Sequence, residues 1–340
     1  MGFDVWAEWR RLTGLDAYSR IQALTAEGVD QRGAAKQRHR ALILDDERSG
    51  RPSEYNKMLE EELARMRRLG LLVPSAPDQA LVRSGWAFVQ FRFTLARPYL
   101  ARDDEPLHVC DNPLRKDRVF KVPLISATSW KGLLRWTAVK LFCDEASSLG
   151  DEEFVGRRLQ LTRLFGNEKD VEMDVEAPLT AYLDEQRLAA GPLYRQALAT
   201  LSATGLVAGR LHFYPTFFDA MGVEVINPHD RKTRAGREPI FFESARIGAQ
   251  GVFSVLYAPL EWSGAPADVW QEELRADLTL LGDALSALFL TYGFSAKRSS
   301  DYGVACDEIE GQLWTCRGAE PLQRLSSLRE AMEHGVRDRS

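Results

Sequence analysis

The sequence predicts an α+β fold, because segments with two different hydrophobic periods follow one another along the chain. Apolar and polar residues alternate from Val89 to Leu95, as in a half-buried strand, and 251–257 is a second strongly β-prone run. Elsewhere apolar residues recur every three or four positions, for example from Leu274 to Leu288, as in an amphipathic helix. Strands and helices are therefore both expected.

Residues 1–80 are predicted to form a helical extension that is separate from the rest of the chain. One helix begins after Ser53, whose hydroxyl can cap it, and ends at Gly70, with acidic residues early and basic residues late. The polar segment 32–51 before it is typical of a solvated helix face or a loop. The stretch 74–77, which contains two prolines, then marks a linker.

The remaining elements follow in the order strand, helix, strand, strand, helix, strand. Their expected positions in this order are 86–95, from Ser129 onward, 209–217, 251–257, 274–288 and 304–309. This order is the ferredoxin-like (RRM-like) βαββαβ arrangement. We expect this core at 85–311, with helical insertions within 152–203, and a helical tail at 312–340.

Composition places the chain among ordinary globular proteins. Its 340 residues are 45% hydrophobic and 27% charged, and no run approaches the roughly 20 apolar residues that span a bilayer. The charged N-terminus lacks an apolar signal-peptide core, so we expect a cytoplasmic protein without a membrane partner. The net charge of -5 argues against a free-standing nucleic-acid binder, although a local basic face is compatible with it.

Cysteine and histidine spacing gives no sign of a metal site. None of the four cysteines belongs to a C-x-x-C pair, and the five histidines are scattered without ligand spacing. We therefore expect the cysteines to be small buried side chains.

The helix expected from about residue 129 has the features of an anion-binding helix end. Its cap is one of three hydroxyl side chains: Ser126, Thr128 or Ser129. The free N–H groups behind such a cap point at an anion. Lys131 and Arg135 lie one turn apart on this helix, and Gly132 lets another backbone come close. The alternative is an ordinary capped helix with two surface cations.

A second basic segment, 292–303, lies between the last expected helix and the last expected strand. The adjacent cations Lys297 and Arg298, followed by Ser299, suit contacts to a phosphodiester backbone. Tyr302 could stack on a base. The alternative is a surface turn.

A third basic segment, 226–240, makes a polar excursion between two expected strands. Its cations are Arg231, Lys232, Arg234 and Arg237. A strand-linking loop this polar is either functional or disordered.

These three segments, in this order, resemble the RAMP (repeat-associated mysterious protein) superfamily of type III CRISPR–Cas complexes. Residues 123–135 resemble its IPGSSLKGxxR motif, and Phe165-Gly166 resembles its FG element. Residues 297–303 resemble its glycine-rich motif, and 227–253 resemble its β-hairpin thumb and the strand after it. The resemblance covers roughly 85–311.

Within this family the chain looks most like the repeated backbone subunit, which stacks along guide RNA and displaces base pairs with its thumb. In catalytic members an aspartate in a D-S-P-x-x-x-D loop cuts target RNA. The corresponding loop here runs from Asp111 to Asp117, so the resemblance makes Asp111 the candidate catalytic residue. Asp111 with Mg²⁺ or another divalent metal would assist attack by the RNA 2′-hydroxyl. His108 could assist, or be a surface histidine; alternative carboxylates are Asp103, Asp104 and Asp117.

The resemblance also implies partners. These are CRISPR guide RNA, target RNA, a large polymerase-like subunit, a small helical subunit and neighbouring RAMP subunits. A non-catalytic guide-binding or capping subunit is the first alternative, and a ferredoxin-like protein-interaction domain is the second. The extension 1–80 could pack on a neighbouring subunit, mimic the small helical subunit, or only fix the oligomer geometry. Its segment 32–51 could act as an RNA-facing arm.

Overall fold

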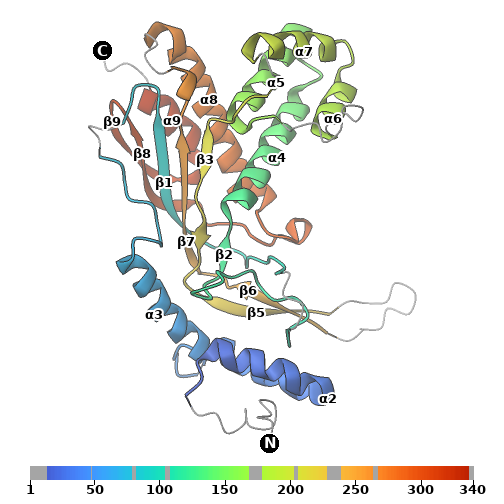
Figure 1. Cartoon of the computed structure of the whole chain (residues 1–340), viewed down its shortest axis with the longest axis vertical. Helices are drawn as coiled ribbons and strands as arrows, with labels where there is room; N and C mark the ends of the chain where they lie inside the picture. Colours follow the sequence, from blue (N-terminus) through green and yellow to red (C-terminus); the bar gives the residue numbers. More distant parts are fainter. Residues whose placement is uncertain are drawn as a thin grey trace, which may run out of the picture.

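The protein is described by a computed structural model that covers residues 14–46, 48–78, 82–103, 108–167, 178–202, 206–227, 239–262 and 267–336. Figure 1 shows a sheet with its covering helices at one end of the molecule and the N-terminal helices at the other. The expected combination of strands and helices in an α+β fold is confirmed. Among the described residues, no helix is long and apolar enough to cross a membrane.

A five-stranded antiparallel sheet forms the centre of the described structure. Its strands, in spatial order, are β3 (Leu211–Phe213), β7 (Gln250–Tyr257), β1 (Ala87–Thr94), β8 (Glu308–Thr315) and β9 (Gly318–Arg324). The predicted alternation in β1 is confirmed, since Val89, Phe91 and Phe93 are buried together. Phe91 lies opposite Phe253 of β7 and Gly311 of β8. A Cβ at Gly311 would lie 2.3 Å from a β1 carbonyl oxygen, so this close pairing requires glycine.

The helices that pack on one face of the sheet are α4 (Ala127–Glu145), α8 (Ala267–Ala287) and α9 (Leu328–Val336). A π-helical turn, η4 (Leu288–Tyr292), continues α8. Trp130 of α4 stacks on Phe289 at a centroid distance of 5.4 Å, within the aromatic core. Its indole N–H donates to Thr216 Oγ1 at 3.0 Å. The buried indole is thereby satisfied, and α4 is fixed at its N-terminal end.

A helical insertion follows α4, as expected. It consists of α5 (Asp151–Phe165), α6 (Pro178–Gln186) and α7 (Ala190–Leu201). Helix α5 is followed by Gly166, which has a φ of 77°. A residue with a side chain would have a strained backbone at this φ. Gly209 lies so close that a Cβ on it would be 2.5 Å from the Phe165 carbonyl carbon. The Phe165-Gly166 element therefore packs directly against the chain that leads into β3.

A two-stranded hairpin projects from the sheet near the start of α4 (Figure 1). Its strands are β5 (Met221–Ile226) and β6 (Ile240–Ala245), paired in register from Met221–Ala245 to Ile226–Ile240. A small sheet of β2 (Leu124–Ile125) and β4 (Thr216–Phe217) lies beside it. The cations Arg231, Lys232, Arg234 and Arg237 lie outside the described residues.

The N-terminal extension contains α2 (Ala17–Ile43) and α3 (Glu54–Arg68). As predicted, Ser53 caps α3 by accepting from Asn56 N, and Gly70 follows the helix with a φ of 68°. The fully buried Tyr55 donates its hydroxyl to Lys121 O at 2.8 Å. A second apolar cluster, separate from the main core, joins these helices to the hairpin. The extension is therefore packed against the rest of the chain.

The C-terminal region differs from its prediction. The last strand expected at 304–309 is β8, which runs from Glu308 to Thr315. Residues 318–324 add the edge strand β9, so helix in the expected tail begins only at Leu328. The prediction failed because this segment mixes charged and apolar residues without a clear alternation. Short 3-10 turns complete the chain: η3 (Leu260–Trp262), η5 (Arg298–Ser300) and η6 (Leu325–Ser327).

Candidate functional site

The loop that contains Asp111 lies along β6 at the base of the hairpin. Asn112 forms a parallel bridge with Phe242, and Glu243 N donates to Asn112 O at 3.0 Å. The backbone N–H of Phe241 donates to Asp111 Oδ2 at 3.3 Å. Residues far apart in sequence therefore place the Asp111 carboxylate beside the hairpin.

The Asp111 carboxylate is paired with a lysine from the N-terminal extension. Lys36 Nζ of α2 lies 2.8 Å from Asp111 Oδ2, and the two side chains are 8% and 19% exposed. The same ammonium lies 5.4 Å from the centroid of the Phe241 ring. The expectation that 32–51 forms a solvated helix face or a loop is therefore wrong for Lys36, which is buried.

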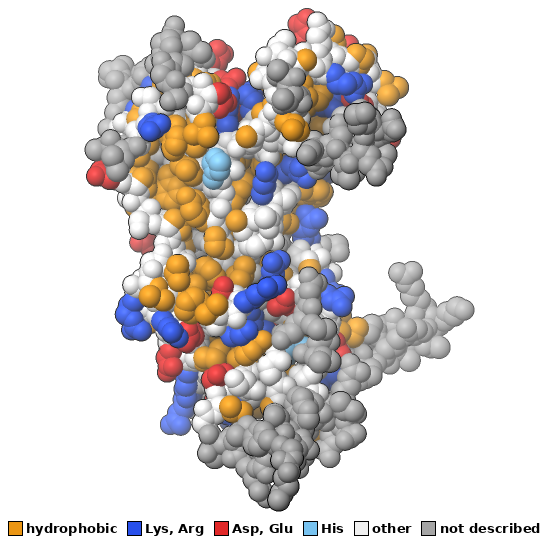
Figure 2. All heavy atoms as spheres, viewed as in Figure 1, with side chains coloured by type: hydrophobic (Ala, Val, Ile, Leu, Met, Phe, Trp, Pro, Cys, Tyr) orange, Lys and Arg blue, Asp and Glu red, His pale blue; other side chains and the backbone are white. Residues whose placement is uncertain are grey.

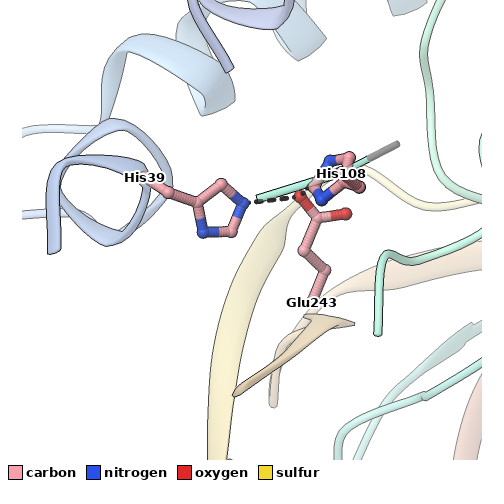
Figure 3. A group of neighbouring side chains, drawn as sticks. All are labelled: His39, His108 and Glu243. Carbon is pink, nitrogen blue, oxygen red and sulfur yellow. Dashed lines mark hydrogen bonds and ion pairs between the residues drawn. The ribbon is translucent and has the colours of Figure 1, made fainter. Parts of the chain in front are cut away.

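Glu243, the residue that follows Phe242 in β6, is at the centre of a buried polar cluster. Its Oε1 lies 2.8 Å from His39 Nε2 and 3.5 Å from His108 Nε2, as Figure 3 shows. Its Oε2 accepts from Leu114 N at 3.0 Å and from the Lys116 ammonium. We call this set, with Lys36 and Asp111, the hairpin-base cluster. It joins α2, the loop 108–116 and β6.

The cluster keeps Glu243 ionised. Complete burial works to raise the pKa of Glu243, but Lys116, the His39 hydrogen bond and the nearby histidines outweigh it and hold the pKa well below its ordinary value. The neighbouring Cys110 thiol shows the opposite effect. Burial, with the adjacent charges of Glu243 and Asp111, raises the pKa of Cys110 to about 12, so this cysteine is an inert thiol.

His39, His108 and Glu243 each offer one potential metal-ligand atom, and these atoms lie within 4.8 Å of one another. Their donor chemistry does not fit a resident metal. The N–H of Cys110 donates to His108 Nδ1 at 3.1 Å, so the neutral ring carries its proton on Nε2, the atom that faces Glu243. Lys116 also meets this carboxylate. The group is therefore a set of donors around one anion.

The Mg²⁺ expected at Asp111 does not fit this arrangement well either. Mg²⁺ binds through carboxylates and phosphate oxygens and retains several waters. Here Asp111 Oδ2 already meets the Lys36 ammonium, which balances its charge. No catalytic step through a resident metal follows from this geometry.

The N-terminal end of α4 has the predicted form. Ser126 is the cap, and its Oγ accepts from Ser129 N at 3.2 Å. Lys131 and Arg135 are half-buried on the following turns. Gly132 between them is exposed, and a Cβ built on it meets nothing within 4 Å. A glycine inside a helix lowers the stability of the helix by about 1 kcal/mol relative to alanine. Packing within the chain therefore does not explain why glycine occurs here.

Side chains of the predicted basic loop 297–303 contact both α4 and the hairpin. The Arg298 guanidinium lies 4.1 Å from the Trp136 ring centroid of α4. Lys297 Nζ lies 4.8 Å from the ring centroid of Phe242 in β6. The loop 297–303 therefore contacts both α4 and the hairpin strand β6, while the cations of the third basic segment lie outside the described residues. We call Lys131, Arg135, Trp136, Lys297 and Arg298 the basic face.

The loop itself is tightly built. Gly303 has a φ of 73°, and a Cβ on it would lie 2.6 Å from Ser295 Cβ. Its N–H donates to Pro98 O at 2.8 Å, which ties the loop to the segment after β1. Tyr302 is half-buried, and burial together with Glu224 of β5 raises its pKa. The side chain of Ser299 lies outside the described residues.

One donor on the basic face has no protein partner in the described part of the chain. Arg298 Nη1 is buried from solvent, yet no described residue accepts a hydrogen bond from it. A guanidinium over an aromatic ring with an unused N–H is suited to an anion. On the face seen in Figure 2, Lys and Arg side chains lie over the region of α4 and the hairpin base.

Of the other predicted residues, Asp117 has a structural role. Its Oδ1 accepts from Val119 N and Phe120 N, both at 2.8 Å, which closes a turn. Asp103 pairs through its backbone with Pro113 O, and Asp104 lies outside the described residues. Asp111 in turn accepts a hydrogen bond from the hairpin backbone.

Sequence reasoning missed the partners of these residues. Lys36, His39, Lys116 and Glu243 are buried charged or polar side chains, and Trp136 is an exposed aromatic. One available signal was the helical spacing of Lys36 and His39, which places both on one face of a helix.

Comparison with known proteins agrees with the predicted family. Residues 82–190, from before β1 into α7, match the model of the RAMP superfamily. The matched part includes 123–135, the segment that carries the predicted resemblance to this superfamily. No curated protein matches the chain.

Two solved structures illustrate the wider similarity. The chain is 14% identical to a chain of the "Cryo-EM structure of the Type III-B Cmr-beta bound to cognate target RNA", with a TM-score of 0.42, over 93% of this chain and 95% of that one. It is also 14% identical to a chain of the "CRISPR RNA-guided surveillance complex, pre-nicking", with a TM-score of 0.36, over 67% and 78%. At such TM-scores the similarity to the RAMP superfamily rests on the match over residues 82–190 and not on these two structures.

Proposed function

We propose that this chain is an RNA-holding subunit of a type III CRISPR effector complex. The observation that supports it best is the meeting of α4, the loop 297–303 and the hairpin through Arg298 on Trp136 and Lys297 on Phe242. Segments that are independent in sequence thereby form one basic face within a chain of net charge -5. Such a local concentration of cations is suited to a polyanion.

We interpret the central fold as the ferredoxin-like βαββαβ core of this family. In this interpretation β1, β3, β7 and β8 are the four core strands, and α4 and α8 are the two connecting helices. The spatial order β3-β7-β1-β8 and the antiparallel pairing support it. The hairpin β5–β6 is then the thumb, with β9 as an added edge strand.

RNA would be held by three kinds of contact. The capped N-terminus of α4, with Lys131 and Arg135, attracts phosphates. Gly132 lets the RNA backbone approach the helix, since no side chain fills that space. The free N–H of Arg298 donates to a phosphate oxygen. The partners in this proposal are guide RNA, paired target RNA and neighbouring subunits in the cytoplasm, including the large polymerase-like and small helical ones.

The hairpin-base cluster has a structural role in this proposal. Asp111 and Glu243 are engaged by Lys36, His39, Lys116 and backbone donors, and both lie beneath or beside α2. We therefore favour a subunit that holds RNA without cutting it, whether in the backbone or at an end of the complex.

Salt-dependent RNA binding tests this proposal. The full chain is titrated into fluorescent single-stranded RNA at several salt concentrations, and the slope of log affinity against log salt is measured. We expect a clear negative slope, which becomes shallower by about 1 when Lys131 is replaced by Ala. The control is Arg275→Ala on the exposed face of α8, which should leave affinity and slope unchanged. Salt-independent binding or none would support a protein-interaction domain instead.

A second candidate is metal-dependent cleavage of target RNA by Asp111, and its position at the hairpin base favours it. The carboxylate would have to leave Lys36 and take up the 2′-hydroxyl proton while that oxygen attacks the adjacent phosphate. The P–O5′ bond then breaks, which leaves a 2′,3′-cyclic phosphate, and the departing 5′-oxygen takes a proton from water. A divalent ion would be brought by the RNA phosphates. The assembled complex is incubated with guide-matched RNA and Mg²⁺. Cleavage that is lost in Asp111→Asn, while RNA binding is retained, would establish this candidate over the first.

A further inference from the structure

The helical insertion forms a groove against the outer face of α4. This α4–α6 groove encloses about 740 Å³ including its open mouth. Among its lining residues are Gly132, Arg135, Trp136, Lys140, Leu179 and Tyr182. Figure 1 shows α6 beside α4, at the end of α4 that points away from the hairpin. The insertion has no assigned part in the RNA contacts described above.

The wall that the insertion provides is held in place by buried polar contacts. Arg158 of α5 is 2% exposed, pairs with Asp184, and lies 3.8 Å from the ring centroid of Tyr194. Arg187 reaches Ala146 O, just beyond the end of α4, at 3.3 Å. These contacts tie α5, α6 and α7 to each other and to α4. The groove is therefore preformed.

The groove combines cations with exposed aromatic rings. Trp136 on the floor is 42% exposed, and Tyr182 on the α6 wall is 45% exposed. Arg135 and Lys140 lie beside them, and Lys140 is paired with Asp144 on its own helix. None of the described residues that line the groove is acidic. This composition suits a nucleotide base with its phosphate.

The groove is continuous with the basic face. Trp136 belongs to both, since Arg298 lies on its ring and Tyr292 meets it edge-on at 5.3 Å. An RNA strand that follows Lys131 and Arg298 would therefore reach the mouth of the groove. The exposed parts of the Trp136 and Tyr182 rings lie at that point, beside a preformed wall.

We propose that the α4–α6 groove binds one unpaired nucleotide of a single-stranded RNA segment. Its base packs against Tyr182 and Trp136, and its phosphate meets Arg135 and Lys140. This inference rests on the proposed function, since it names a nucleotide subsite next to the basic face. The insertion thereby acts as the outer wall of an RNA site.

The test uses the full chain and single-stranded RNAs that carry one 2-aminopurine at successive positions. We expect quenching at one position only, because stacking on aromatic rings quenches this base. Tyr182→Ala should abolish that quenching and lower single-strand affinity about tenfold, since base–aromatic stacking is worth about 1–3 kcal/mol. Tyr182→Phe keeps the aromatic ring, so it should keep both the quenching and the single-strand affinity. Leu188→Ala, on the same insertion and 78% exposed, is the matched control.

The outcomes separate this inference from the proposed function. Salt-sensitive RNA binding that Tyr182→Ala leaves unchanged would overturn the groove alone. An equal loss of single-strand and duplex binding would also overturn it, because a paired base cannot enter. If assembly with other subunits is lost while RNA affinity is kept, the groove is a protein site. A parent chain that binds no RNA overturns the proposed function itself. Circular dichroism of each variant confirms that it is folded.

Discussion

The hairpin-base cluster and the basic face are both rich in charge, but they differ in how far their polar groups are satisfied. In the hairpin-base cluster, one carboxylate, Glu243, meets Lys116, His39, His108 and a backbone N–H within the buried core. On the basic face, cations lie on aromatic rings, and Arg298 keeps a buried N–H that no described residue accepts. Among the described residues, His108 Nε2 also lacks a hydrogen bond, but it faces the Glu243 carboxylate, so the hairpin-base cluster is satisfied in charge and stabilises the fold. A buried guanidinium N–H without an acceptor is instead suited to a ligand.

This difference separates Asp111, which the family resemblance made the candidate catalytic residue, from the predicted RNA-binding residues Lys297 and Arg298. Asp111 belongs to the satisfied region through Lys36, although the loop match made it the candidate catalytic residue. Lys297 and Arg298 belong to the unsatisfied region. Stability measurements should therefore respond to the first region, and RNA affinity to the second.

The largest expected effect is on stability, from Glu243→Ala. Removal of this carboxylate leaves Lys116 and two histidines buried without their anion, which costs about 3–5 kcal/mol of unfolding free energy. Urea denaturation measures it. Glu308→Ala, whose side chain is 77% exposed on β8, is the matched control and should change stability by less than about 0.5 kcal/mol. Similar losses of unfolding free energy in both variants would contradict a structural role for the hairpin-base cluster.

A pH series sharpens the same comparison. The pKa of Glu243 is lowered in the folded chain, so its contribution is complete above the unfolded pKa of about 4.3 and is lost as pH falls further. The stability advantage over Glu243→Gln should be constant near neutral pH. It should then shrink by up to about 1.4 kcal/mol per pH unit below that value. A difference that changes mainly near neutral pH would assign the titration to a group other than Glu243.

Arg298→Ala should weaken RNA binding by about tenfold while leaving stability nearly unchanged. The variant loses a cation, a stacked guanidinium and the free N–H. Arg298→Lys keeps the charge but not the planar fork, and we expect it to recover only part of the affinity. Fluorescence anisotropy at fixed salt measures both. An unfolded Arg298→Ala chain would instead place Arg298 in the structural region.

The smallest effect on RNA affinity is expected from Asp111→Asn. We expect a stability loss of up to about 3 kcal/mol, because the buried Lys36 loses its charge partner although it keeps its contact with the Phe241 ring. RNA affinity should stay within about twofold. A large loss of affinity with normal stability would move Asp111 into the RNA-contacting region.

Local patterns in the sequence predicted a large part of the fold. The alternation in β1, the cap at Ser53 and the choice among Ser126, Thr128 and Ser129 all depend on neighbours within a few residues. The edge strand β9 was missed, because an edge strand with mixed polar residues has little periodicity. The cations of the basic face were predicted in two separate segments, at 129–135 and 297–303, and the contact between these segments could be seen only in the fold.

The hairpin-base cluster could not be predicted for a different reason. His39 and Glu243 are 204 residues apart, and Lys36 is 75 residues from Asp111. Such buried pairs contain residue types that are usually exposed, so a single sequence favours a surface interpretation. The role of Asp111 changed most for this reason, since its partner lies in a segment that no family motif covers.

The most direct test of the account compares RNA affinity in Arg298→Ala and Asp111→Asn by anisotropy on the same single-stranded RNA, with unfolding measured in parallel. The account predicts about a tenfold loss of affinity for Arg298→Ala and an affinity within about twofold of the parent for Asp111→Asn. Full affinity in Arg298→Ala, combined with a large loss in Asp111→Asn, would contradict it.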